Sequence, residues 1–144
     1  MNISEINTIS VAGISVRTSN SNEIEPSSAK IGPLWEEFYT KFGSKLTQNS
    51  RVFGLYSNYE SDHTGAFDVA ACSDVIDAQG LTDFQIPSGK YLVFSATGDM
   101  PQAVIDLWGE IWSYFDSQSC NLKRAFTTDF EQYKGEREIE IYIA

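Results

Sequence analysis

Two distant stretches of this chain carry the same amphipathic pattern, and this repeat limits the fold more than any other feature. Residues 31–42 (IGPLWEEFYTKF) align without a gap on residues 104–115 (VIDLWGEIWSYF), with Leu, Trp, Glu and the final Phe identical. In both stretches the apolar residues recur at the spacing of a helix with one buried face. A repeated helix with its flanking segments favours a duplicated fold with a pseudo-twofold axis.

Alternating apolar residues predict strands before and after each helix. The order strand–helix–strand–strand is therefore expected twice, which indicates an α+β fold. In the first half, the predicted elements are a strand over 6–18 that bends at Gly13, a helix over 31–42 that ends at Gly43, and strands over 52–59 and 67–72. In the second half, they are a strand over 84–96 interrupted at 87–89, a helix over 98–115 with Asp99 as its N-cap, and two terminal strands that end at 143.

The length suits one domain. A chain of 144 residues with 42% hydrophobic residues can bury a core of its own. We expect a single domain over 1–144, with one half at about 6–73 and the other at about 84–144. Two such halves side by side leave a cleft at their junction, where ligand sites often form.

The charge balance argues against a nucleic-acid partner. Acidic residues outnumber basic ones by 20 to 10, which gives a formal net charge of −10. A protein that binds the nucleic-acid backbone carries a basic stripe instead. The acidic balance favours neutral or cationic partners. No apolar run is long enough to span a membrane, and residues 1–5 do not begin a signal peptide, so we expect a cytoplasmic protein without a membrane partner. A homodimer is compatible with the sequence.

The last residues, 126–143, read as a β-hairpin around Lys134-Gly135. A two-residue loop at this point would place Glu131 opposite Glu138, and Asp129 opposite Glu140. The apolar faces of the two strands would then coincide, which supports this register. The other face would be a patch of carboxylates edged by Tyr133 and Tyr142. Like charges directly opposite on a sheet are destabilising, so this face requires an explanation.

Two interpretations of the carboxylate patch stay open. The patch could attract an organic cation or a metal, with Tyr133 and Tyr142 adding cation–π contacts. It could also be a solvated outer face of the sheet, partly balanced by Lys134 and Arg137. Among the tryptophans, Trp35 and Trp108 match in the repeat and are expected in the core, whereas Trp112 is expected to reach a cleft.

No motif for catalysis or cofactor binding is present. The sequence has no GxGxxG, P-loop or GxSxG pattern, and Cys72 and Cys120 are not in a zinc-ligand spacing. His63 is the only histidine, so a His-rich zinc site cannot form. We therefore expect no cofactor, no metal site and no catalytic residue.

A series of short motifs, in chain order, points to one family. The motifs are residues 11–18 (VAGISVRT), 31–38 (IGPLWEEF), 52–60 (VFGLYSNYE), 86–91 (IPSGKY), 107–112 (LWGEIW), 130–133 (FEQY) and 138–143 (EIEIYI). Together they resemble the GyrI-like (gyrase-inhibitor-like) effector-binding domain. That domain is attached to AraC-type and MerR-type multidrug-responsive transcription regulators and also occurs alone, including in integron-cassette proteins.

The resemblance implies a curved antiparallel sheet of about eight strands, two main helices and a central ligand cleft. It also implies a ligand, a small lipophilic cation such as a cationic drug or dye, held between aromatic rings and a buried glutamate. The Phe-Glu-x-Tyr motif of the family assigns that glutamate to Glu131. Glu138 and Glu140, from the carboxylate patch, become second-rank candidates. The implied aromatic walls are Tyr133, Tyr142, Tyr59, Tyr91, Trp108 and Trp112. The chain departs from the regulators in having no room for a helix-turn-helix domain.

Two alternatives to a binding module remain. Some similar proteins are hydrolases of reactive electrophiles, in which Glu131 would be the general base and Tyr133 or Tyr91 the proton donor. The gyrase inhibitors imply a third function, a protein-interaction module that uses the acidic surface. The residues alone do not separate these hypotheses, and a non-enzymatic binding module for aromatic cations is our primary one.

Overall fold

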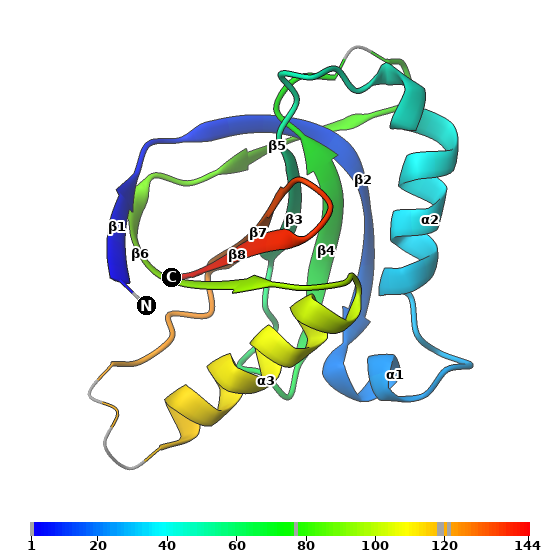
Figure 1. The fold of residues 1–144 in the computed structure, drawn as a ribbon. Helices are drawn as coiled ribbons and strands as arrows, with labels where there is room; N and C mark the ends of the chain where they lie inside the picture. Colours follow the sequence, from blue (N-terminus) through cyan, green and yellow to red (C-terminus); the bar gives the residue numbers. More distant parts are fainter. Residues whose placement is uncertain (1, 77, 118–119, 121) are drawn as a thin grey trace.

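The computed structural model describes residues 2–76, 78–117, 120 and 122–144. Within these residues the elements follow one another in an order that repeats (Figure 1). The first set is β1 (Asn2–Ile6), β2 (Ile9–Ser19), α1 (Asn20–Ile24), α2 (Ile31–Phe42), the 3-10 helix η1 (Gly43–Lys45), β3 (Val52–Ser57) and β4 (Ala66–Ser73). The second set is β5 (Thr82–Ile86), β6 (Gly89–Thr97), α3 (Gln102–Asp116), β7 (Thr128–Lys134) and β8 (Glu138–Ile143).

The strand order is itself symmetric. The eight strands form one antiparallel sheet in the order β1-β6-β8-β7-β3-β4-β2-β5. The counterparts in the two sets are β1 and β5, β2 and β6, β3 and β7, and β4 and β8. When each strand is exchanged with its counterpart, the same order results, read from the other end of the sheet. This confirms the α+β fold and its duplicated strand–helix–strand–strand modules, with β3 and β7 as the neighbouring pair at the pseudo-twofold axis.

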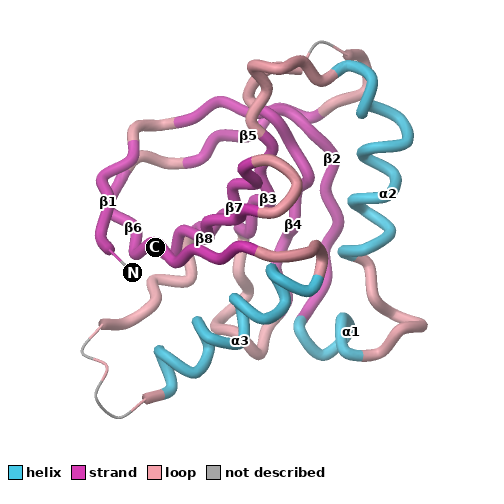
Figure 2. The backbone as a smooth tube through the Cα atoms, in the orientation of Figure 1, coloured by secondary structure: helices cyan, strands magenta, loops and turns pink. Residues whose placement is uncertain are grey.

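The two ends of the sheet are joined because β1 and β2, which follow each other in the chain, pair with β6 and β5, which also follow each other. β1 pairs with β6, with Ile6 opposite Gly89, and β2 continues the same register against β5, with Ile9 opposite Ile86. At Gly13, β2 leaves β5 (partner Thr82) and pairs with β4 (partner Cys72). The sheet therefore curls strongly, as Figure 2 shows.

The curled sheet separates two hydrophobic layers. The inner face encloses Phe53, Tyr91, Phe130 and Tyr142 in one core cluster. On the outer face, α2 packs on β2 and β4, whereas α3 packs on β6 and β8 (Figures 1 and 2). The central strands β3 and β7 lie between these two packing areas, so the space above them is filled by side chains that reach in from both helices.

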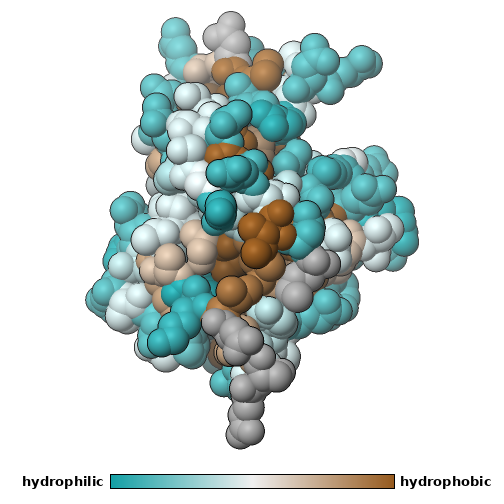
Figure 3. All heavy atoms as spheres, turned by 90° about the vertical axis from the view of Figure 1, so that its left-hand side faces the viewer, coloured by the Kyte–Doolittle hydropathy of each residue, from teal (hydrophilic) through white to brown (hydrophobic). Residues whose placement is uncertain are grey.

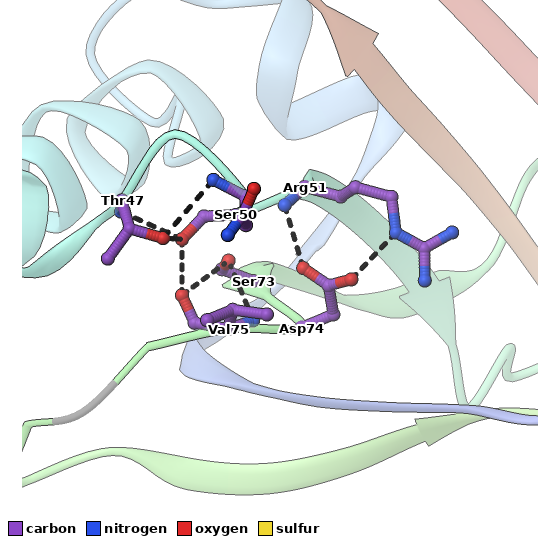
Figure 4. A network of polar contacts seen from close by, with 7 residues as sticks. Thr47, Ser50, Arg51, Ser73, Asp74 and Val75 are labelled. Carbon is purple, nitrogen blue, oxygen red and sulfur yellow. Dashed lines mark hydrogen bonds and ion pairs between the residues drawn. The ribbon is translucent and has the colours of Figure 1, made fainter.

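A polar network fixes the start of β3 (Figure 4). The backbone N–H of Arg51 donates to Asp74 Oδ1 at 2.7 Å, and its Nε donates to Asp74 Oδ2 at 2.6 Å. Ser50 Oγ donates to the carbonyl oxygen of Val75 at 2.5 Å. These contacts tie the chain before β3 to the end of β4 and so support the pairing of β3 with β4.

The structure corrects several predicted boundaries. The helix over 31–42 is confirmed, but α3 begins at Gln102 with Pro101 as its N-cap, so Asp99 is not the cap. The strand predicted over 6–18 is divided between β1 and β2. Residues 122–127 precede β7 as irregular chain, so the first strand of the hairpin predicted over 126–143 begins at Thr128.

The outer surface mixes polar and apolar residues. On the face that contains β1, apolar side chains gather near the centre and are surrounded by polar ones (Figure 3). Two exposed aromatic residues, Tyr39 and Trp112, lie at equivalent positions of α2 and α3. Among the described residues, no helix has the length and hydropathy to cross a membrane.

Gly13→Ala is predicted to destabilise the fold. A Cβ atom at this position would lie 2.6 Å from Cys72 Cβ and 2.7 Å from Cys72 Cα, and it would also meet the carbonyl oxygen of Ala71. Because two of these atoms belong to the backbone of β4, the strand must move, and we expect a loss of about 1–3 kcal/mol in the free energy of unfolding. Urea denaturation measures this loss.

Gly109→Ala is the matched control. A Cβ atom at Gly109 in α3 meets nothing within 4 Å. Alanine is the better helix former by about 1 kcal/mol, so this variant should be as stable as the parent protein or more stable. Equal stability of Gly13→Ala and the parent protein would contradict the close packing of β2 on β4.

Candidate functional site

The β7–β8 hairpin differs from its predicted register. Glu131 lies opposite Ile141, and Asp129 lies opposite Ile143, because the loop contains three residues, 135–137. The prediction of a two-residue loop at Lys134-Gly135 was therefore wrong. The residue opposite Glu131 is Ile141 and not Glu138, and this odd shift in register places the side chains of β8 on the opposite face from the one predicted. The carboxylate patch does not form: Asp129 and Glu131 face the helices, whereas Glu138 and Glu140 are on the other face.

Glu131 is buried at the centre of the outer face. The residue is only 2% exposed. Oε2 accepts hydrogen bonds from the Tyr56 hydroxyl and from Trp108 Nε1, both at 2.7 Å. Oε1 accepts a hydrogen bond from the Tyr133 hydroxyl at 3.0 Å. Three aromatic side chains from β3, α3 and β7 thus converge on one carboxylate.

The surroundings act on the Glu131 pKa in two directions. Burial raises the pKa, because a carboxylate loses its hydration there. The donors Trp108, Tyr56 and Tyr133 lower it, because their hydrogen bonds favour the charged form, but burial dominates and the pKa lies above its usual value. Burial, followed by the charge of Glu131 and the hydrogen bond to it, raises the pKa values of Tyr56 and Tyr133, so both phenols remain protonated donors.

Gly54 makes room for this carboxylate. It lies directly opposite Glu131 in the β3–β7 ladder. A Cβ atom at Gly54 would collide with Glu131 Oε1 and would lie 3.2 Å from Trp35 Cζ2. The two strands can be aligned from their last residues, Ser57 in β3 and Lys134 in β7. In this alignment Gly54 and Glu131 are equivalent residues of the two halves, and they lie beside the pseudo-twofold axis. There is space for one long side chain at this point, and Glu131 occupies it.

The aromatic residues around Glu131 follow the same symmetry. In the same alignment of β3 with β7, Tyr56 is equivalent to Tyr133, and both hydroxyls donate to the Glu131 carboxylate. The helices contribute Trp35 and Tyr39 from α2, with stacked rings 5.9 Å apart, and Trp108 and Trp112 from α3, 6.4 Å apart. Trp35 also contacts the ring of Tyr133 at 5.2 Å, and Trp108 that of Tyr56 at 5.2 Å.

The exposed ends of these two rows mark the rim of the site. Tyr39 is 49% exposed and Trp112 is 47% exposed, whereas Trp35 and Trp108 are half-buried. Each helix therefore presents one ring to the carboxylate region and one to solvent. Trp112 reaches the surface next to Trp108, and Tyr39 does the same next to Trp35.

A second buried carboxylate lies two residues before Glu131. Asp129 Oδ2 accepts hydrogen bonds from the Tyr59 hydroxyl at 2.5 Å and from Arg124 Nη2 at 2.7 Å. Its Oδ1 accepts one from the backbone N–H of Ala144 at 2.9 Å. Asp129 is thus already paired, and Tyr59 belongs to this cluster rather than to the donors of Glu131.

The other predicted residues lie on the inner face. Tyr142 stacks on Phe130, with ring centroids 4.3 Å apart, and Tyr91 contacts the edge of Phe130 at 5.2 Å. The Tyr142 hydroxyl donates to Glu140 Oε1 at 2.9 Å, and burial together with this hydrogen bond raises the tyrosine pKa to about 12. The structure therefore brings Glu131, Tyr133 and Trp108 together, with Trp112 and Tyr59 adjacent, and separates Tyr91, Tyr142 and Glu140 from them by the sheet.

Several residues of the site were missed in the sequence. Tyr56, Trp35, Tyr39 and Gly54 all contribute to it, and Arg124 borders it. The repeat contained a signal for some of them, because Trp35 and Tyr39 match Trp108 and Trp112. Gly54 and Tyr56 depend on the β3–β7 register, which no local pattern fixes. Within the described part of the chain, no group of three His, Cys, Asp or Glu side chains is arranged to hold a metal ion.

Comparisons with known proteins agree with this architecture. The profile of a family described as integron-associated effector binding protein (Cass2) matches residues 2–144. The protein YobU of Bacillus subtilis (strain 168), named as a transcriptional regulator, is 30% identical over 148 residues, which cover 92% of this chain and 89% of YobU.

Solved structures give the same result. An integron cassette protein from the mobile metagenome of Vibrio cholerae shares 56% identity and superposes with a TM-score of 0.94 over 99% of this chain and 94% of that one. The protein SAV2435, solved with tetraphenylphosphonium bound, superposes with a TM-score of 0.73 over 99% of this chain and 91% of SAV2435. Its identity of 19% shows a shared fold alone.

Glu131→Gln is predicted to change how stability depends on pH. The folded-state pKa of Glu131 is raised above its usual value of 4.5, so the folded protein holds this proton at a pH where the unfolded chain has lost it. The contribution of Glu131 to stability is therefore complete below the unfolded pKa and falls as pH rises through the folded pKa. Glutamine does not titrate, so the stability of the parent protein relative to the variant should decrease as pH rises through this window.

Urea denaturation at a series of pH values measures this difference. Glu136→Gln, in the exposed β7–β8 loop, is the control and should show no such pH-dependent change. A stability difference for Glu131→Gln that rises with pH would mean that the hydrogen bonds outweigh burial, contrary to our assignment.

Gly54→Ala is predicted to disturb the carboxylate directly. The added methyl group displaces Glu131 Oε1 and so weakens its hydrogen bond to Tyr133. We expect a loss of about 1–3 kcal/mol in the free energy of unfolding, measured by urea denaturation. The same substitution should be less destabilising in a Glu131→Ala background, where the colliding atom is absent. An equal loss in both backgrounds would argue against this contact as its cause.

Proposed function

The chain belongs to the family of integron-associated effector-binding proteins, and we propose that its effector is a lipophilic aromatic cation that binds between α2 and α3 with Glu131 as counter-charge. The single observation that carries this proposal is the environment of Glu131. The carboxylate is buried under aromatic rings, and it takes part in none of the ion pairs formed by the described residues. Its three partners are all neutral donors.

A buried carboxylate without a cationic partner attracts one. Desolvation of an ionised carboxyl group is unfavourable unless a charge or several hydrogen bonds compensate for it. A cation that enters between the rings would provide the missing charge without requiring water. Each aromatic ring facing a desolvated cation contributes up to about 2 kcal/mol, so several rings add both affinity and a preference for positive charge.

The rings also define how the ligand enters. Glu131 is covered by Trp108, Tyr56 and Tyr133, so a ligand must take the place of some of these contacts. The half-exposed Tyr39 and Trp112 stand at the rim, where a flat or propeller-shaped aromatic ligand would first make contact. Trp108 covers Glu131 from the side of α3, because its indole N–H donates to the carboxylate. Rotation of this side chain away from Glu131 would open a path for the ligand to the carboxylate. Binding would therefore change the environment of at least one tryptophan.

The relatives support the same class of ligand. SAV2435 has this fold and was solved with tetraphenylphosphonium, a cation that carries its charge at the centre of four aromatic rings. The site described above offers a matching arrangement, one carboxylate surrounded by rings from both halves of the chain. The family description, effector binding, agrees with a module whose task is recognition of a small molecule.

Glu131→Gln is predicted to weaken the binding of aromatic cations selectively. Removing one member of a buried charge pair should lower the affinity for tetraphenylphosphonium and for methylphenylpyridinium by about tenfold or more. The affinity for phenylpyridine, the uncharged analogue, should change little. Isothermal titration calorimetry or quenching of tryptophan fluorescence provides the dissociation constants. Because protonated Glu131 cannot pair with a cation, affinity in the parent protein should rise as pH rises through the Glu131 pKa.

Glu110→Gln is the matched control. It makes the same change of charge on the exposed side of α3, away from the carboxylate, and should leave all affinities unchanged. The variant Glu131→Gln should also lose the pH dependence of binding. Equal affinities for methylphenylpyridinium and phenylpyridine in the parent protein, or unaltered cation binding in Glu131→Gln, would refute the proposal.

A further inference from the structure

The ion pair of Arg124 and Asp129 is buried next to the proposed ligand site. The side chain of Arg124 is 7% exposed and that of Asp129 is 0% exposed, and Nη2 and Oδ2 are 2.7 Å apart. Buried arginines are normally held by several hydrogen bonds. Here the Nε of Arg124 is buried and has no hydrogen-bond partner among the described residues. The position of Arg124 is therefore explained by its charge rather than by a complete set of hydrogen bonds.

Arg124 also contacts a ring of the ligand site. Its guanidinium carbon lies 5.8 Å from the centroid of Trp108 and 4.4 Å from that of Phe126. Trp108 is the residue whose Nε1 donates to Glu131. One indole ring thus has the carboxylate of Glu131 at its edge and the guanidinium of Arg124 near its face. Arg124 already makes the cation–π contact that an aromatic cation would make with this ring.

The two carboxylates lie on one face of the same strand. Asp129 and Glu131 are two residues apart in β7, which corresponds to about 6.6 Å along a strand. Tyr59 donates to the first carboxylate and Tyr56 to the second, and both tyrosine rings contact Phe67. The region between α2, α3 and β7 therefore contains two anionic positions, of which one is occupied by a cation of the protein itself.

We propose that Arg124 is a specificity-determining residue that limits the ligand to one positive charge. It neutralises Asp129, so Glu131 is the single carboxylate left for a ligand. This inference rests on the function proposed above, because it concerns the same site. A ligand with two positive charges would bring its second charge near the guanidinium. At an effective dielectric constant of about 20, two like charges about 7 Å apart change an equilibrium by tenfold or more.

Two cations with one skeleton test the inference. Methylphenylpyridinium carries one charge, and methyl viologen, which also has two linked aromatic rings, carries a charge at each end. The parent protein should bind the monocation more tightly. In Arg124→Gln, Asp129 is released as a second anionic position, so the ratio of the two dissociation constants should shift toward the dication by about tenfold or more. Calorimetric titration of the 144-residue chain measures both constants.

Controls separate the local effect from the change in net charge. Arg137→Gln removes the same charge from an exposed ion pair with Asp99 and should leave the ratio unchanged. Arg124→Gln leaves Asp129 buried without a cation, and circular dichroism reports whether this variant folds. If it does not fold, Asp129→Asn supplies the test. This variant leaves Arg124 uncompensated, so affinity for the monocation should fall by about tenfold, and the double variant Arg124→Gln/Asp129→Asn should recover it.

The outcomes for the two proposals are distinct. An unchanged ratio in a folded Arg124→Gln variant that still binds the monocation would overturn the role of Arg124. The same conclusion would follow if Asp129→Asn bound the monocation as tightly as the parent protein. A parent protein that binds neither cation would instead contradict the proposed function.

Discussion

The pairing of Gly54 with Glu131 is the constraint on which the rest of the site depends. The pair lies on the two central strands, between the area where α2 packs on β2 and β4 and the area where α3 packs on β6 and β8. A carboxylate can be buried there because the opposite residue has no side chain and because three aromatic donors reach it. The strands fix the carboxylate, and the helices supply the rings Trp35 and Trp108 beside it.

The role of the aromatic residues in the fold competes with the role proposed for them in ligand binding. In the structure, Trp108 and its neighbours cover Glu131 and satisfy its oxygens. The same rings would have to face a ligand cation. Binding of the proposed ligand would therefore exchange internal contacts for ligand contacts, and its affinity would depend on the difference between them. Arg124 would take part in this exchange as well, because its guanidinium lies against Trp108 and pairs with Asp129.

The duplicated fold could be predicted from the sequence because helix periodicity and strand alternation are local. The apolar spacing within residues 31–42 and within residues 104–115 is enough to predict which face of each helix is buried. The hairpin register could not be predicted, because two- and three-residue loops at Gly135 both produce well-formed strands. Helix packing decides between them, since Ile139 and Ile141 must face α3. Glu131 was assigned by family resemblance, and its partners Tyr56 and Gly54 depend on pairing between halves of the chain.

The symmetric strand order has a consequence for how such a site can arise. A single half would present β3 as an open edge, and two identical halves could join through it as an isologous dimer. In that dimer the residue at the axis would face its own copy, so two glutamates would collide and repel, or two glycines would leave no charge. Covalent fusion removes this identity. The position at the axis can then become glycine in one half and glutamate in the other. A single charge can thus be placed at the pseudo-twofold axis, among aromatic rings that both halves supply.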